Sequence, residues 1–234
     1  MSRIVNSRSG AALIFALALV FNLTCLVIAP ARAYFVNFTA PGFNPGENSS
    51  SITRNLGGYQ VTVEVIAPVG ASLFWSGVGH PDAYGFLDGF GINGGPLSYQ
   101  ADEIEGPEIL RVRFATPVNL YSIQLTNLFV EGSPSYLEQG FYSLNGSAPV
   151  AFLADPNQRA GSVNDGLRIL TGFSPSSVSQ IDFTAPGRIN GQSHEFSLAG
   201  LDIGFAVLPG PATLLLLGMG LVGVWFMTRR RDSA

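Results

Sequence analysis

The chain has 234 residues and a formal net charge of −4, and all 12 of its basic residues are arginines. Residues 34–208 hold six of these arginines and fifteen acidic residues, so this segment has a net charge of −9. Binding to nucleic acid requires a basic surface, and we therefore expect no nucleic-acid partner. An acidic segment of this kind suits solubility outside the cell or the binding of divalent cations.

The N-terminus has the three parts of a signal peptide. Arg3 and Arg8 form a basic region, residues 11–28 are apolar, and Ala31 and Ala33 provide the small-x-small pattern of a cleavage site. We expect signal peptidase to cleave after Ala33, following export through the Sec translocon. The single cysteine lies inside this leader, so the mature chain has no disulfide.

The segment 34–208 shows the two-residue period of half-buried strands. Apolar and polar residues alternate over Gln60–Ile66, Ile109–Phe114, Tyr121–Leu125 and Leu201–Val207. Asn-Gly and Asp-Gly dipeptides supply turns between shorter apolar runs. The pattern predicts an all-β domain, a single β-sandwich of jelly-roll type spanning 34–208.

The segment Phe43–Arg54 is rich in Asn and Ser, and we expect it to form an exposed loop. Aromatic residues are concentrated in the glycine-rich stretch that follows. Trp75, Tyr84 and Tyr99 are candidates for stacking on sugar rings. The alternative is that these rings fill the core.

Acidic residues cluster in a second segment. Asp102, Glu103 and Glu105 lie close together, Glu108 begins the next predicted strand, and Asp202 lies on the polar face of the last one. Calcium takes oxygen ligands from carboxylates, so these five residues form a candidate Ca²⁺ site. The alternative is that they are solvated loop charges.

Catalytic motifs are weak. His80 and His194 lie outside any nucleophile elbow or metalloprotease motif, and we expect both to be solvated loop residues. A pair of the clustered acids could in principle serve glycoside hydrolysis. We nevertheless expect that the protein is not an enzyme.

The C-terminal residues predict a membrane-spanning helix. Residues 212–228 are uncharged and apolar, at the short end of the ~17–25 residues that span a bilayer. Arg229, Arg230 and Arg231 follow and are expected to remain in the cytoplasm. Pro209-Gly210-Pro211 breaks the chain before the helix.

The whole tail, 209–231, resembles the PEP-CTERM sorting signal of exported proteins in Gram-negative bacteria. The match runs through the following residues: Pro209, Pro211, Thr213, Leu214–Leu217, Gly218, Gly220, Gly223 and Arg229–Arg231. Gly210 stands where that family usually has glutamate. The resemblance implies an inner-membrane precursor that an exosortase processes near Pro209-Gly210-Pro211.

The resemblance also implies a destination. The processed protein would be at the cell surface or secreted, associated with exopolysaccharide or biofilm matrix. The aromatic residues leave an alternative, a carbohydrate-binding, lectin-like module, and the clustered acids leave a less favoured one, a glycan-active enzyme.

Overall fold

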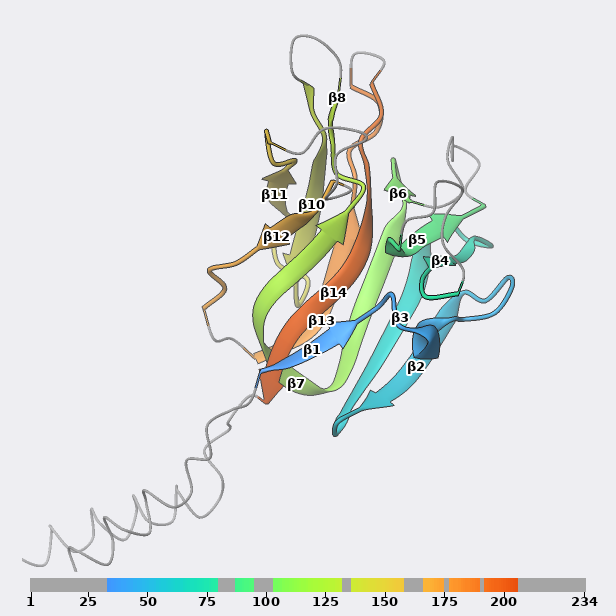
Figure 1. Cartoon of the computed structure of the whole chain (residues 1–234), viewed down its shortest axis with the longest axis vertical. Coiled ribbons are helices and arrows are strands. Elements are labelled where there is room, and N and C mark those ends of the chain that lie inside the picture. Colours follow the sequence, from blue (N-terminus) through green and yellow to red (C-terminus); the bar gives the residue numbers. More distant parts are fainter. Residues whose placement is uncertain are drawn as a thin grey trace, which may run out of the picture. The chain divides into compact units, whose positions relative to one another are not determined.

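Strands make up nearly all of the regular structure. The computed structural model describes residues 33–79, 87–94, 103–131, 136–157, 166–174, 177–189 and 192–205. Within these ranges the only helical segment is a single 3₁₀ turn, η1 (Pro41–Phe43). The strands form a large antiparallel sheet and a separate two-stranded one, which confirms the all-β class (Figure 1).

The first part of the chain supplies seven strands, which are β1 (Tyr34–Asn37), β2 (Ser51–Leu56), β3 (Tyr59–Ala67), β4 (Ser72–Ser76), β5 (Gly89–Asn93), β6 (Ile104–Glu105) and β7 (Ile109–Thr126). The second part supplies seven more, which are β8 (Val130–Glu131), β9 (Tyr136–Leu137), β10 (Gln139–Leu144), β11 (Val150–Leu153), β12 (Arg168–Leu170), β13 (Ser177–Thr184) and β14 (Glu195–Phe205).

The long strand β7 belongs to two groups of strands. Near Val112 it pairs with β3 on one side and β13 on the other, and the order of this group is β2-β3-β7-β13-β10-β11. Near Ile123 it pairs with β14 on one side and β12 on the other. Strands β1, β5 and β6 lie along the far edge of β14, and β4 pairs with β5.

The pairing of β7 with β13 is interrupted over a short stretch that includes Pro117. Between Val178 and Gln180, β13 advances two residues while the paired positions on β7 move from Val118 to Arg113. The unmatched residues include Pro117, which has no N–H to donate to a ladder and therefore favours such an irregularity. Figure 1 shows that β7 changes direction between its first and second halves.

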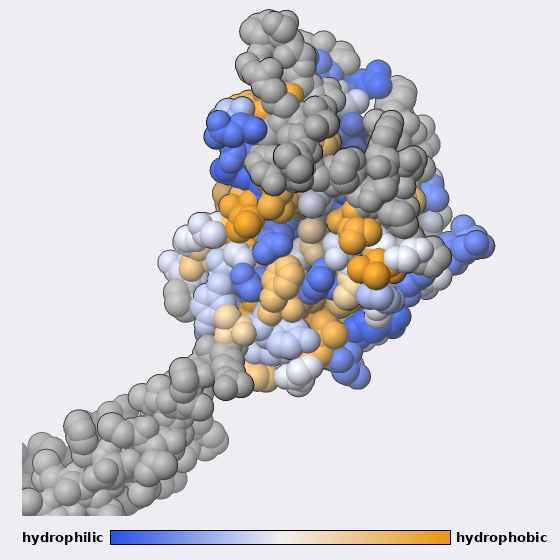
Figure 2. Space-filling model, viewed as in Figure 1, coloured by the Kyte–Doolittle hydropathy of each residue, from blue (hydrophilic) through white to orange (hydrophobic). Residues whose placement is uncertain are grey.

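One apolar cluster receives side chains from both groups. Leu110, Val112 and Phe114 are buried on the first half of β7, and Ile123 and Leu125 on the second. The alternation predicted for Ile109–Phe114 is therefore confirmed. On the outer surface in view, apolar side chains are interspersed with hydrophilic ones (Figure 2).

The last strand departs from the predicted pattern at its end. Leu201 and Ile203 are fully buried as expected, but Phe205 is 45% exposed. Its ring instead stacks on Tyr59, with the two ring centroids 4.2 Å apart. The description of β14 reaches Phe205, and the predicted continuation to Val207 lies outside the described residues.

Most of the predicted export signals lie outside the described residues. They are Ala31 of the cleavage motif, Pro209, Gly210, Pro211 and Thr213, the apolar segment 212–228, and Arg229, Arg230 and Arg231. Among the residues that are described, none belongs to a helix long and apolar enough to span a membrane.

Candidate binding groove

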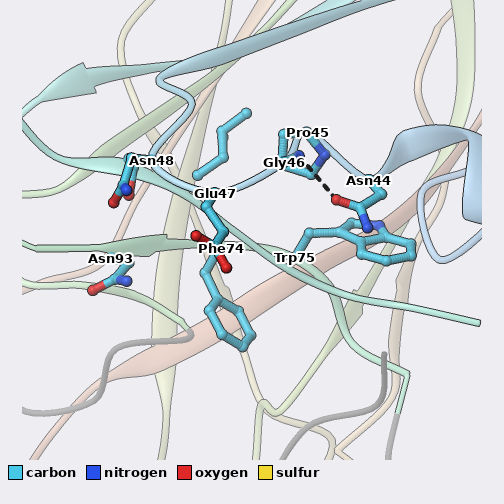
Figure 3. Close-up of a pocket in the computed structure, with 10 residues that line it drawn as sticks. Asn44, Pro45, Gly46, Glu47, Asn48, Phe74, Trp75 and Asn93 are labelled. Atoms are coloured by element: carbon cyan, nitrogen blue, oxygen red, sulfur yellow. Dashed lines mark hydrogen bonds between the residues drawn. The ribbon is translucent and has the colours of Figure 1, made fainter. Parts of the chain in front are cut away.

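A groove of about 480 Å³ opens beside strand β4. Its walls come from three segments that are distant in the sequence: the loop 44–48, residues 72–75 of β4, and Asn93 at the end of β5. Figure 3 shows these side chains around the groove. The volume falls within the range of about 300–1,000 Å³ that is typical of small-ligand sites.

Strand pairing brings the three segments together. Ser72 on β4 pairs with Asn93 on β5, which places the asparagine at the same end of the hairpin as the start of β4. The N–H of Leu73 donates to the carbonyl oxygen of Ser49, 2.7 Å away, and so attaches the loop to the free edge of β4.

The loop itself is held by hydrogen bonds. The side-chain oxygen of Asn44 accepts from the N–H of Gly46 at 2.9 Å, and Gly46 has a φ of 79°, which favours glycine. Arg54 donates through Nη2 to the carbonyl oxygen of Asn44 at 3.3 Å, and through Nε to that of Gly42. The sequence predicted an exposed loop over Phe43–Arg54, whereas the structure buries Phe43, places Ser51–Arg54 in β2 and ties the loop between them to that strand.

The two aromatic residues of β4 have different environments. Trp75 is 8% exposed, and its indole Nε1 donates to the carbonyl oxygen of Phe38 at 2.7 Å. It therefore belongs to the core, in agreement with the alternative interpretation. Phe74 is half-buried and lines the groove. The other stacking candidates, Tyr84 and Tyr99, lie outside the described residues.

Three of the predicted calcium ligands are buried rather than solvated. Glu103, Glu105 and Glu108 all lie at the strand β6, where Glu105 pairs with Glu195 of β14. The backbone N–H of Glu105 donates to Oε2 of Glu108 at 2.9 Å. Asp102 lies outside the described residues.

Burial perturbs the pKa of Glu108. The residue is 2% exposed, and burial raises its pKa from 4.5 to about 7, while the hydrogen bond from Glu105 opposes the shift and the charge of Glu105 adds to it. A carboxyl that is partly protonated near neutral pH is a weaker cation ligand. Within the described residues there is no group of three or more acidic, His or Cys side chains placed to hold a metal.

Asp202 is not brought to this cluster. It lies on β14 seven residues beyond Glu195, a separation of about 23 Å along an extended strand. Its carboxylate instead accepts from the hydroxyl of Ser122 at 2.7 Å. The predicted five-residue calcium site therefore does not assemble as one set.

His194 lies in a loop as predicted, but the prediction that it is solvated is wrong, because the residue is 4% exposed. The N–H of Gln139 donates to Nδ1 at 3.0 Å, so the proton of the neutral ring is on Nε2, against the Tyr136 hydroxyl. Burial lowers the pKa of His194. Both ring nitrogens of His194 therefore take part in hydrogen bonds. The residue lines a second cavity, of about 220 Å³. His80 lies outside the described residues.

Sequence reasoning missed the polar lining of the groove. The sequence predicts an exposed loop at Asn44, Glu47 and Asn48 and a turn at Asn93. Only the Asn residues near turn glycines gave any signal, and that signal indicates turns rather than a site.

Comparison of the chain with known protein families, with curated proteins and with solved structures gave no match.

Proposed function

We propose that the protein is exported and acts at the cell surface or in the extracellular matrix, in association with exopolysaccharide. In this proposal the leader is removed after Ala33, and the apolar segment 212–228 anchors the precursor in the inner membrane. An exosortase then processes the chain near Pro209-Gly210-Pro211.

The observation that carries the proposal is the position of the first strand. Strand β1 begins at Tyr34, the residue that follows the predicted cleavage site, and Tyr34 pairs with Ile203 near the end of β14. Cleavage after Ala33 would therefore leave every described strand intact. The start of β1 and the end of β14 are also neighbours in the sheet.

We interpret the body as a β-sandwich of jelly-roll type. Support comes from the two groups of strands that share β7 and from the single apolar cluster to which both contribute. We also propose that this body binds rather than catalyses. In support, the ring of His194 offers no free lone pair for general-base catalysis, because Nδ1 accepts from the N–H of Gln139 and Nε2 carries the ring proton.

Mass spectrometry of the mature surface form tests the sorting proposal. We expect an N-terminal peptide starting at Tyr34 and no peptide from 214–231. A variant with Arg229, Arg230 and Arg231 all replaced by Gln should be retained less well in the membrane, and Gly210→Glu should be processed at least as completely as the parent. A surface form with Met1 or an intact tail would contradict the proposal.

A further inference from the structure

The groove beside β4 has the chemistry of a site for an uncharged polyol. Three of its lining residues, Asn44, Asn48 and Asn93, carry side-chain amides, which both donate and accept hydrogen bonds. Sugar hydroxyls also donate and accept, so amides match them without regard to charge. Among the described residues, the side chains of Glu47, Asn48 and Asn93 make no hydrogen bond, and all three are exposed.

Charge in the groove excludes anionic ligands. Among the described residues that line the groove, Glu47 is the one ionisable side chain and none is a cation. Phosphate, sulfate or uronate groups would meet a carboxylate with no compensating arginine, within a body of net charge −9. A carboxylate is, however, a strong acceptor for the hydroxyls of a neutral sugar.

Phe74 supplies an apolar surface within this polar lining. It is half-buried on β4, whereas its neighbour Trp75 is fixed in the core. The C–H face of a pyranose ring is apolar and packs on aromatic faces. A half-buried phenyl flanked by amides and a carboxylate therefore offers both kinds of contact that a sugar ring makes.

The groove is also ordered before any ligand binds. Arg54 holds the loop to β2, Ser49 holds it to β4, and the indole of Trp75 is anchored to Phe38. A preformed site loses little conformational entropy on binding, which favours weak, repeated contacts along a polymer.

We propose that this groove binds a neutral polysaccharide, with Phe74 stacked on one sugar ring and Glu47, Asn48 and Asn93 hydrogen-bonded to its hydroxyls. The inference goes beyond export, because it states what the body holds once it is outside the cell. It does not require the tail to be processed, so its failure would leave the sorting proposal standing.

The test uses the full chain purified in detergent micelles and immobilised dextran, soluble β-glucan, galactomannan and polygalacturonate. We expect retention on at least one neutral polymer and none on polygalacturonate. Phe74→Ala should weaken that retention about tenfold or more, and Phe74→Tyr, which keeps the ring, should preserve it. Asn93→Ala should weaken it by a smaller factor.

Phe173→Ala is the matched control, because Phe173 is also half-buried but packs on Tyr142, away from the groove lining. It should bind like the parent, and thermal unfolding of each variant verifies that it is folded. Retention of none of the neutral polymers, strongest retention on polygalacturonate, or a folded Phe74→Ala variant that binds like the parent would each overturn the proposal.

Discussion

Glu108 imposes a pH-dependent cost on the folded body, and Glu108→Gln should remove it. The pKa of this carboxyl rises from 4.5 in the unfolded chain to about 7 in the folded one, chiefly through burial. Below pH 4.5 both states are protonated and no cost arises. As the pH rises toward 7 the unfolded state loses its proton first, so the free energy of unfolding falls by about 3 kcal/mol once the pH exceeds 7.

The neutral amide of Gln can still accept from the N–H of Glu105, so the variant keeps that contact. We expect Glu108→Gln to be more stable than the parent by about 3 kcal/mol at pH 8 and nearly equal to it at pH 4. Urea unfolding of residues 34–208, followed by circular dichroism from pH 4 to 8, measures this difference. Glu47→Gln makes the same change in net charge on an exposed loop and serves as the control.

A stability difference that stays constant from pH 4 to 8, or a variant less stable than the parent at pH 8, would refute this reasoning. Calcium adds a second arm to the assay, because a ligand that binds only the folded state stabilises it. The described acidic side chains are not grouped to hold a metal, so we expect millimolar calcium to leave the stability of both the parent and Glu108→Gln unchanged at pH 8. Stabilisation of the parent alone would show that Glu108 takes part in a calcium site.

Three further predictions concern other parts of the body. Gly89 has a φ of 91°, and a Cβ there would overlap the carbonyl oxygen of Leu198, so Gly89→Ala should destabilise the body by more than about 2 kcal/mol in urea unfolding. Arg111 binds Asp182 through two hydrogen bonds of 2.7 and 3.0 Å in a partly buried position, and Asp182→Asn should cost about 1 kcal/mol, with a double-mutant cycle isolating the pair. Burial lowers the pKa of His194, so the unfolded chain takes up a proton before the folded one as the pH falls below 6.5, and the contribution of His194 to stability is lost. The parent should therefore melt at a higher temperature than His194→Asn at pH 7.5, and this difference should shrink toward pH 5.

The strands were the part of the fold that local sequence pattern could predict. Gln60–Ile66 falls within β3 and Ile109–Phe114 within β7, with the expected side chains turned inward. Alternation is a property of neighbouring residues, because successive side chains on a strand point to opposite faces. The alternation of apolar and polar residues therefore holds wherever one face of the sheet is packed against the core.

Local pattern failed where burial depends on strands that are distant in the sequence. Nothing beside His194 in the chain indicates that Gln139 and Tyr136 will enclose it. Glu108 follows a proline in an acidic segment, which is typical of a solvated loop, yet β6 pairs with β14 and buries it. The sequence leaves open whether Trp75 stacks on a sugar or fills the core, and its hydrogen bond to Phe38 places it in the core.

The amino-acid sequence alone therefore determined the β class and the acidic charge of residues 34–208, since each depends on composition or on adjacent residues. Tertiary structure decided the division of β7 between two groups of strands, the burial of Glu108 and the assembly of the groove. The groove joins Asn44, Phe74 and Asn93 across more than 40 residues of chain. Such a contact is fixed by which strands pair, and strand pairing is a property of the whole sheet rather than of any one segment.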